Sequence, residues 1–223
     1  MTDPDRESWI VEQLSNLPDK ADAALILRHA EREEIPQGTF GVDVPLTTSG
    51  VTSAERLGAI LSGIRPLVYA SASPVPRCVS TATAILRGGG WPEEVALDWR
   101  LGDPGPFVVD EEVSGALFLE TGILEIVRHQ LTLAEPPAGM RPTAEGINLL
   151  LGLTTNNLYS HGRLNIYVTH DAILAVLVAY LYRLRIDEIN WPGYLDGLLL
   201  WRSGDRVNFI WRGLEQGSHP LGC

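Results

Sequence analysis

Cysteine is scarce in this sequence of 223 residues, and long hydrophobic stretches are missing. The two cysteines, Cys78 and Cys223, are too few for a disulfide framework, which fits a reducing compartment. Residues 1–20 are acidic and amphipathic, and they lack the basic start and apolar core of a secretory signal. The longest apolar stretch, residues 172–182, is too short to span a bilayer and predicts a buried helix. We therefore expect a cytoplasmic protein with no membrane partner.

Basic residues are also in deficit. The chain has 17 lysines and arginines against 28 aspartates and glutamates, which gives a formal net charge of -11. This balance argues against a nucleic acid or an anionic membrane surface as a partner. A small anionic ligand would therefore need a local cluster of arginines. The sequence leaves open whether the chain forms a homodimer.

Short apolar runs alternate with helical patterns along the chain. The clearest runs are residues 23–27, 67–70 and 164–169, and each is followed by residues with helical spacing. Such alternation is typical of crossover units on a parallel sheet. We predict one α/β domain over residues 1–223, a three-layer sandwich whose mainly parallel central sheet has helices on both faces. Further strands are expected at residues 95–98, 198–202 and 207–212, the last two as a hairpin.

The alternation is interrupted between residues 102 and 140. Several prolines and glycines surround one expected helical segment there, at residues 113–131. We interpret residues 102–140 as a small inserted cap. Insertions of this kind often cover active sites.

Polar residues of an unusual kind follow three of the expected strands. They are Arg28-His29 after the first strand, residues 71–77 after the second, and His170-Asp171 after the late strand. Ligands of an open parallel sheet bind beyond the carboxyl ends of its strands. We therefore expect these side chains to form one site. Core packing gives no reason to place His29 between Arg28 and Arg32.

These motifs resemble a known family. The run Arg28-His29-Ala30-Glu31-Arg32 is similar to the Arg-His-Gly-x-Arg signature of the histidine phosphatase superfamily, which includes phosphoglycerate mutases, acid phosphatases and phytases. Asp43-Val44-Pro45-Leu46-Thr47 with Gly50 resembles the family's Leu-Thr-x-x-Gly helix start. The departure is Ala30, where most members carry glycine, and it bears on how closely the backbone approaches a phosphate.

Two later motifs extend the resemblance over residues 24–200. Ser73-Pro74-Val75-Pro76-Arg77, followed by Thr81-Ala82, is similar to the family's Ser-Pro-x-x-Arg and Thr-Ala. Thr169-His170-Asp171 resembles the second family histidine at the end of a late strand. Four elements in the family's order make the resemblance specific.

The resemblance implies that His29 attacks phosphorus while Arg28, Arg32, Arg77 and His170 hold the three non-bridging oxygens. Elementary chemistry agrees with these roles. A phosphoryl group in transfer spreads negative charge over three oxygens, so fixed cationic donors stabilise it. Arginine suits this task because its planar fork stays charged and binds two oxygens at once.

Two carboxyl groups compete as the proton donor to the leaving oxygen. Asp171 follows His170, and in the acid phosphatase branch the aspartate at this place is the donor. Asp103 ends the run of residues 99–103, which looks like the segment where the mutase branch carries a donor glutamate. We favour Asp171, whose alternative role is that of a helix N-cap.

Several functions remain open at this point. We expect a phosphomonoester hydrolase that acts on a small phosphate ester without metal or other cofactor, because no ligand spacing supports a metal and arginines flank the histidines. One alternative is a mutase that returns the phosphoryl group to a sugar-acid intermediate. The other is a phosphate-binding regulatory protein that has lost turnover. The substrate cannot be read from the sequence.

Overall fold

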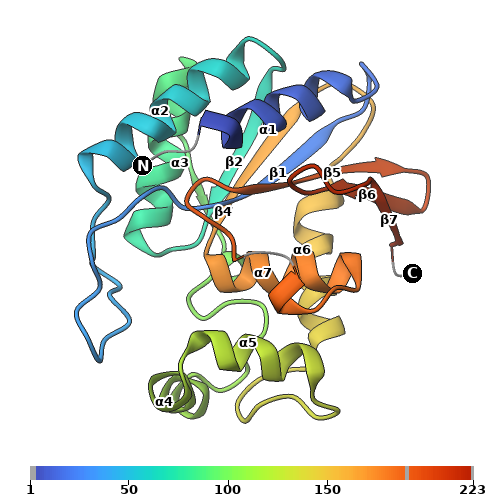
Figure 1. The fold of residues 1–223 in the computed structure, drawn as a ribbon. Helices are drawn as coiled ribbons and strands as arrows, with labels where there is room; N and C mark the ends of the chain where they lie inside the picture. Colours follow the sequence, from blue (N-terminus) through green and yellow to red (C-terminus); the bar gives the residue numbers. More distant parts are fainter. Residues whose placement is uncertain (1–3, 189–190, 222–223) are drawn as a thin grey trace.

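The computed structural model describes residues 4–188 and 191–221, which form a central sheet between helical layers (Figure 1). Cys223 lies outside the described residues. The helices are α1 (Pro4–Asn16), α2 (Thr48–Ser62), α3 (Pro76–Gly89), η1 (Trp99–Leu101), α4 (Glu111–Thr121), α5 (Ile123–Thr132), α6 (Thr143–Thr155), α7 (Asp171–Tyr182) and η2 (Ile186–Glu188). The strands are β1 (Ala23–Arg28), β2 (Leu67–Ala72), β3 (Ala96–Leu97), β4 (Leu164–Thr169), β5 (Gly197–Ser203), β6 (Arg206–Ile210) and β7 (Gly217–Pro220).

The strands within these residues form one sheet in the order β3-β2-β4-β1-β5-β6-β7. Strands β3, β2, β4 and β1 are parallel, whereas β5, β6 and β7 continue from β1 in antiparallel pairs. The predicted parallel core is confirmed, and the complete sheet is mixed. The hairpin of β5 and β6 is also confirmed. The sequence analysis missed β7 because its residues, Gly-Ser-His-Pro, contain no apolar run.

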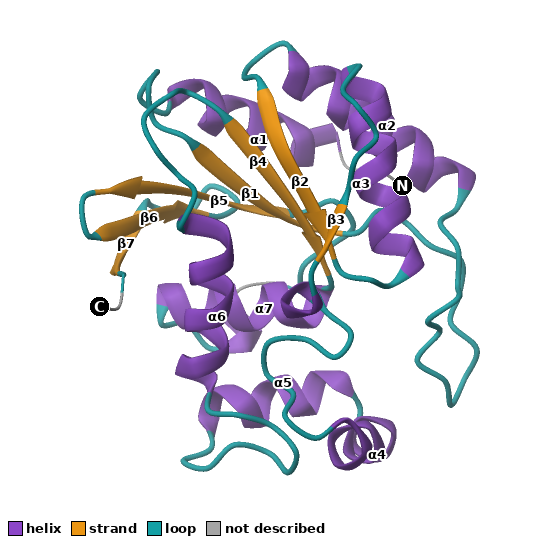
Figure 2. Cartoon of the chain, turned by 180° about the vertical axis from the view of Figure 1, so that it is seen from behind, coloured by secondary structure: helices purple, strands orange, loops and turns teal. Residues whose placement is uncertain are grey.

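Alternation along β1 explains why the centre of the sheet is apolar without a break. Leu25 and Leu27 join the cluster under α1, α2 and α3, while Ala24 and Ile26 join the cluster under α6 and α7. Successive side chains of a strand point to opposite faces, so a strand covered on both faces is apolar throughout. Figure 2 shows the two helical layers on either side of the strands. The predicted layered α/β architecture is confirmed.

Residues 102–140 leave the sheet, and α4 and α5 lie beyond α7 at the lower end of Figure 1. The prediction of one helical segment at residues 113–131 is wrong in that two helices, α4 and α5, occupy this stretch. Gly122 ends α4 and precedes α5 with a φ of 83°, a left-handed value that favours glycine and breaks the helix. Helix α5 then packs against α7.

Across residues 4–188 and 191–221, the helices all fall short of the length and apolar character that crossing a membrane requires.

Candidate active site

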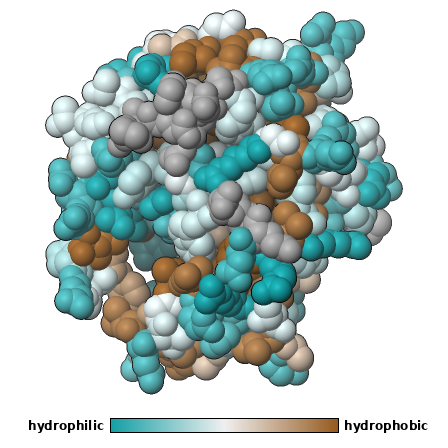
Figure 3. Space-filling view, viewed as in Figure 1, coloured by the Kyte–Doolittle hydropathy of each residue, from teal (hydrophilic) through white to brown (hydrophobic). Residues whose placement is uncertain are grey.

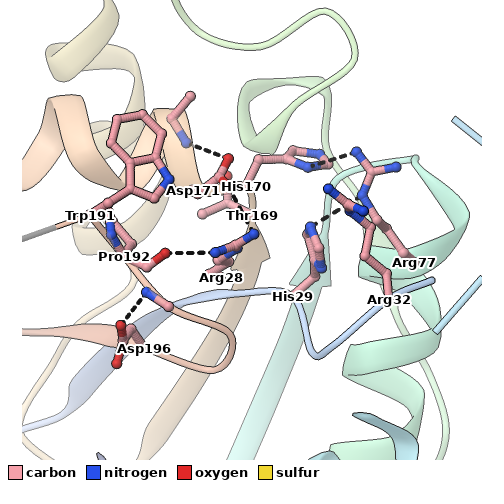
Figure 4. A network of polar contacts seen from close by, with 12 residues as sticks. Arg28, His29, Arg32, Arg77, Thr169, His170, Asp171, Trp191, Pro192 and Asp196 are labelled. Atoms are coloured by element: carbon pink, nitrogen blue, oxygen red, sulfur yellow. Dashed lines mark hydrogen bonds and ion pairs between the residues drawn. The ribbon is translucent and has the colours of Figure 1, made fainter. Parts of the chain in front are cut away.

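Three neighbouring parallel strands end at the same edge of the sheet, and a polar residue follows each of them. His29 follows β1, Ser73 follows β2 and His170 follows β4. Because β2, β4 and β1 are adjacent, the structure brings these residues together. The two histidine rings lie 5.6 Å apart between centroids and face the arginine side chains shown in Figure 4.

His29 is held as a neutral ring. Its Nδ1 lies 2.8 Å from the carbonyl oxygen of Ala30, and a carbonyl only accepts, so Nδ1 carries the proton. Its Nε2 accepts a hydrogen bond of 3.2 Å from Nε of Arg77. Burial, supported by the charges of His170, Arg77 and Arg28, lowers the pKa of His29 to about 2. The ring therefore presents a lone pair on Nε2, which a nucleophilic histidine requires.

His170 is oriented by partners on both ring nitrogens. Its Nδ1 lies 3.3 Å from Nη2 of Arg77, which only donates, so Nε2 carries the proton and donates to Oγ of Ser73 at 3.0 Å. Ser73 in turn donates to the carbonyl oxygen of Gly102. Burial first, and then the charge of Arg77, lowers the pKa of His170 to about 3. A Cβ at residue 102 would lie 2.4 Å from the His170 ring, so glycine is needed there.

Arg77 lies between the two histidines and is 9% exposed. Its Nε and Nη2 reach His29 and His170, and its Nη1 donates to the carbonyl oxygen of Gly41 at 2.8 Å. Helix α3 begins at Pro76, whose ring fits the first helical position, so Arg77 sits in the first turn. Contacts with protein groups thereby fix the fork in three directions.

Arg28 is fixed on the other side of His29. Its Nη1 donates to the carbonyl oxygen of Pro192 at 2.7 Å, and its Nη2 forms an ion pair of 3.0 Å with Asp171. The guanidinium carbon lies 4.2 Å from the ring centroid of Tyr194, a cation–π geometry. The other oxygen of Asp171 accepts from the backbone N–H of Ala172 at 2.8 Å. Asp171 is the first residue of α7, and its N-cap is His170, so the alternative role predicted for Asp171 is wrong.

The sequence analysis did not single out Pro192 or Tyr194. Their loop is positioned by Asp196, which Figure 4 shows beside Pro192. The buried carboxylate of Asp196 accepts from the N–H of Gly193 and pairs with Arg212. Because Arg212 lies beyond β6, this support depends on the antiparallel half of the sheet. Local spacing carries no signal for it.

Arg32 belongs to a turn that the Leu-Thr-x-x-Gly motif holds in place. Thr47 caps α2 by accepting from the N–H of Gly50, and its hydroxyl donates to the carboxylate of Glu31 at 2.8 Å. A Cβ at Gly50 would lie 2.2 Å from the Glu31 carbonyl oxygen, so a larger residue would push the turn away. Arg32 itself donates to the carbonyl oxygen of Glu33 and lies beside Arg77 in Figure 4.

Ala30 is compatible with this geometry. Its N–H donates to Oγ1 of Thr81 at 3.0 Å, and that hydroxyl donates to the carbonyl oxygen of Arg77. The Ala30 side chain is fully buried and belongs to the apolar cluster under α2 and α3. Its methyl group therefore packs into the core, and the Thr-Ala motif ties the two arginine-bearing segments together.

A cavity of about 310 Å³, here called the histidine cavity, contains the predicted binding groups. Its polar lining consists of Arg28, His29, Arg32, Thr39, Arg77, His170 and Asp171. Three arginines thus face one carboxylate, a positive site in a chain of net charge -11. Such a site suits a phosphate-sized anion.

Asp103 does not line the histidine cavity. It is exposed, has a φ of 63°, and lines a second cavity of about 340 Å³, here called the apolar cavity. The two cavities are neighbours because Arg77 and His170 line both of them. The structure therefore places Asp171 with the histidines and Asp103 one cavity away.

For the part of the chain that the structure describes, no group of three or more histidine, cysteine, aspartate or glutamate side chains is arranged to hold a metal ion. His29, His170 and Asp171 line the histidine cavity together with three arginines.

Comparison with known proteins agrees with the motifs and the fold. A family model described as the histidine phosphatase superfamily (branch 1) matches residues 24–103, which include Arg28, His29, Arg32, Arg77 and Asp103. This match confirms the resemblance inferred from the motifs. No curated protein sequence matches the chain.

Solved structures with the same fold include a mycobacterial glucosyl-3-phosphoglycerate phosphatase, at 20% identity and a TM-score of 0.56, covering 81% of this chain and 90% of that one. Bacillus stearothermophilus YhfR has 21% identity and a TM-score of 0.53, covering 82% of this chain and 93% of that one. The product of the open reading frame Rv3214 from Mycobacterium tuberculosis has 16% identity and a TM-score of 0.55, covering 86% and 97%. At these identities the similarity establishes the fold.

Proposed function

We propose that this protein, which resembles the histidine phosphatase superfamily in motifs and fold, hydrolyses small phosphate monoesters through a phosphohistidine at His29. One observation carries the proposal. A buried, neutral His29 directs an unprotonated Nε2 toward Arg77, inside a cavity that Arg28 and Arg32 also line. Nucleophile and anion-binding groups therefore meet at one point.

The reaction has two steps. In the first, Nε2 of His29 attacks phosphorus in line with the leaving oxygen, the N–P bond forms, the P–O bond breaks, and the leaving alkoxide takes a proton. Arg28, Arg32 and Arg77 hold the non-bridging oxygens, whose charge they neutralise in the transition state. His170 completes the set, because binding of a dianion favours its protonated form. In the second step water attacks phosphorus, the P–N bond breaks, and inorganic phosphate leaves with His29 neutral again.

Asp171 is our first candidate for the proton donor. Its carboxylate lines the histidine cavity and forms an ion pair with Arg28. A phosphate dianion would compete with Asp171 for Arg28, which frees the carboxyl group to serve the leaving oxygen. The same group can accept the proton of the attacking water in the second step. Asp103 is the second candidate, because it lines the adjoining apolar cavity.

The proposal is tested by trapping the intermediate. Wild-type protein mixed rapidly with ³²P-labelled phosphate ester and quenched in alkali should carry label on histidine, and His29→Ala should carry none and lose essentially all hydrolysis. His161→Ala is the matched control, because His161 is exposed and lines neither cavity. His29→Ala with near wild-type turnover would disprove covalent catalysis at this residue.

Product analysis separates hydrolysis from the mutase alternative. With a phosphoglycerate as substrate, a hydrolase releases inorganic phosphate, whereas a mutase yields the isomeric phosphoglycerate. Phosphate binding without release of either product would instead favour a regulatory role.

A further inference from the structure

The apolar cavity adjoins the histidine cavity and is not needed to hold a phosphate. Arg77 and His170 line both cavities, as do three apolar side chains, Phe40, Phe118 and Ile123. A group bonded to a phosphate in the histidine cavity therefore has a direct way into the apolar cavity. In Figure 3 a hollow borders hydrophobic surface near the lower end of the molecule, where Figure 1 places α4 and α5.

The walls of the apolar cavity come from several segments, four of which provide the apolar side chains considered next. The loop after β1 provides Phe40 and Val42, the start of the insertion provides Phe107, α5 provides Val127, and α7 provides Ile173. Phe107 is held tightly, because a Cβ on Gly146 of α6 would lie 2.2 Å from its ring. This wall is therefore built for an apolar partner and is fixed by close packing.

Charge in the apolar cavity is confined to a few residues. Among the described residues that line it, the charged groups are Arg77, Asp103 and Glu111. Arg77 faces the histidines, so the remaining charges are negative. A second anionic group on the substrate would meet two carboxylates with no further cation to pair with, which is unfavourable in a partly desolvated site.

We propose that the apolar cavity binds the alcohol part of the substrate, and that the preferred substrates are monoesters of apolar alcohols with the phosphate as their sole anionic group. This inference rests on the proposed function. The volume of about 340 Å³ is about twice that of an engineered cavity that holds one benzene ring, so a two-ring aromatic or a medium alkyl chain fits. Phosphorylated sugar acids are then poor substrates.

The test uses esters whose leaving groups have similar chemistry. Ethyl, propyl and hexyl phosphate all release a primary alcohol, so kcat/KM along the series reports on apolar contact. Complete burial of one methylene raises binding about fourfold, and we expect hexyl phosphate to exceed ethyl phosphate by about 30-fold or more. Compared with propyl phosphate, 3-phosphoglycerate has the same carbon chain with a carboxylate and a hydroxyl, and it should react about tenfold more slowly or worse.

Two adjacent residues of α5 provide a matched pair of variants. Ile123 lines both cavities and is 45% exposed, whereas Leu124 is 44% exposed and lines neither. Ile123→Ser should lower the hexyl-to-ethyl ratio about threefold or more, because it removes an apolar contact with the longer chain. Leu124→Ser should leave that ratio within experimental error. Equal effects of the two substitutions would overturn the inference.

The outcomes distinguish this inference from the proposed function. Rapid hydrolysis of p-nitrophenyl phosphate with a flat alkyl series, or with 3-phosphoglycerate preferred, overturns the apolar specificity and leaves the hydrolase intact. If no ester is hydrolysed, the proposed function fails. Calorimetric binding of hexyl and ethyl phosphate to His29→Ala then still tests whether the apolar cavity binds the alkyl chain. Equal affinities for the two esters would exclude such binding.

Discussion

Replacing Arg77 by lysine tests how far catalysis depends on a preorganised arginine fork. The Nε, Nη1 and Nη2 atoms of Arg77 point to His29, Gly41 and His170 at distances of 2.8 to 3.3 Å. A lysine keeps the charge but has one nitrogen, so it cannot keep these three directions at once. Loss of one preorganised transition-state donor costs about 3–4 kcal/mol, and lysine would recover part of it. We expect Arg77→Lys to lose about 2–3 kcal/mol of transition-state stabilisation, which lowers kcat/KM about 30- to 150-fold.

The measurement is steady-state hydrolysis of p-nitrophenyl phosphate, with circular dichroism and thermal unfolding as controls for the fold. Arg87→Lys is the matched control on the same helix, since Arg87 is exposed and forms ion pairs with Glu55 and Glu93 at the far end of α3. It should retain wild-type kcat/KM. Arg77→Ala should lose more than Arg77→Lys, about 3–4 kcal/mol of transition-state stabilisation. Activity of Arg77→Lys within twofold of wild type would refute the idea that the fork contacts the transferring phosphoryl group.

The other predictions concern the proton donor and the buried histidines. If Asp171 is the general acid, Asp171→Asn slows alkyl phosphates far more than p-nitrophenyl phosphate, whose leaving group needs little protonation. The same selective loss in Asp103→Asn would transfer the role to Asp103. Because the pKa of His29 and of His170 lies well below the unfolded value of about 6.5, the unfolded chain binds the additional protons, so stability decreases as the pH falls from 7 toward 3. The free energy of unfolding, measured in urea without phosphate, should fall between pH 7 and pH 5 by about 2 kcal/mol less in His29→Asn than in wild type. An identical pH dependence of the two proteins would contradict the burial of a neutral His29.

Sequence patterns predicted the part of the fold that carries the histidines, and the reason is local. Strand β1 is buried on both faces and reads as an apolar run up to Arg28, and β4 is buried throughout although it contains Asn165, so the polar residues that follow each strand are conspicuous. The parallel direction of β2, β4 and β1 then follows from the crossover helices. Convergence of Arg28, His29 and His170 could therefore be expected before the structure.

What escaped prediction depends on contacts between distant segments. Tyr194 contacts Arg28 only because Asp196 and Arg212 hold its loop, and the Asp196 carbonyl oxygen accepts from the N–H of Arg28. The apolar cavity is likewise assembled from several segments, and no local pattern relates Phe40 to Ile173. Local periodicity defines elements, but it does not show which loops meet at the edge of a sheet.

The charges of the site also explain how an acidic chain could select an anion. Surface charges farther than about 8 Å are largely screened at physiological ionic strength, so the arginines of the histidine cavity outweigh the net charge of -11. Asp171 neutralises part of this positive charge through its ion pair with Arg28. In the apolar cavity, Asp103 and Glu111 reverse the sign of the lining. The potential therefore changes from positive to negative along the path that an ester would occupy, which favours a molecule with its phosphate at one end and no charge at the other.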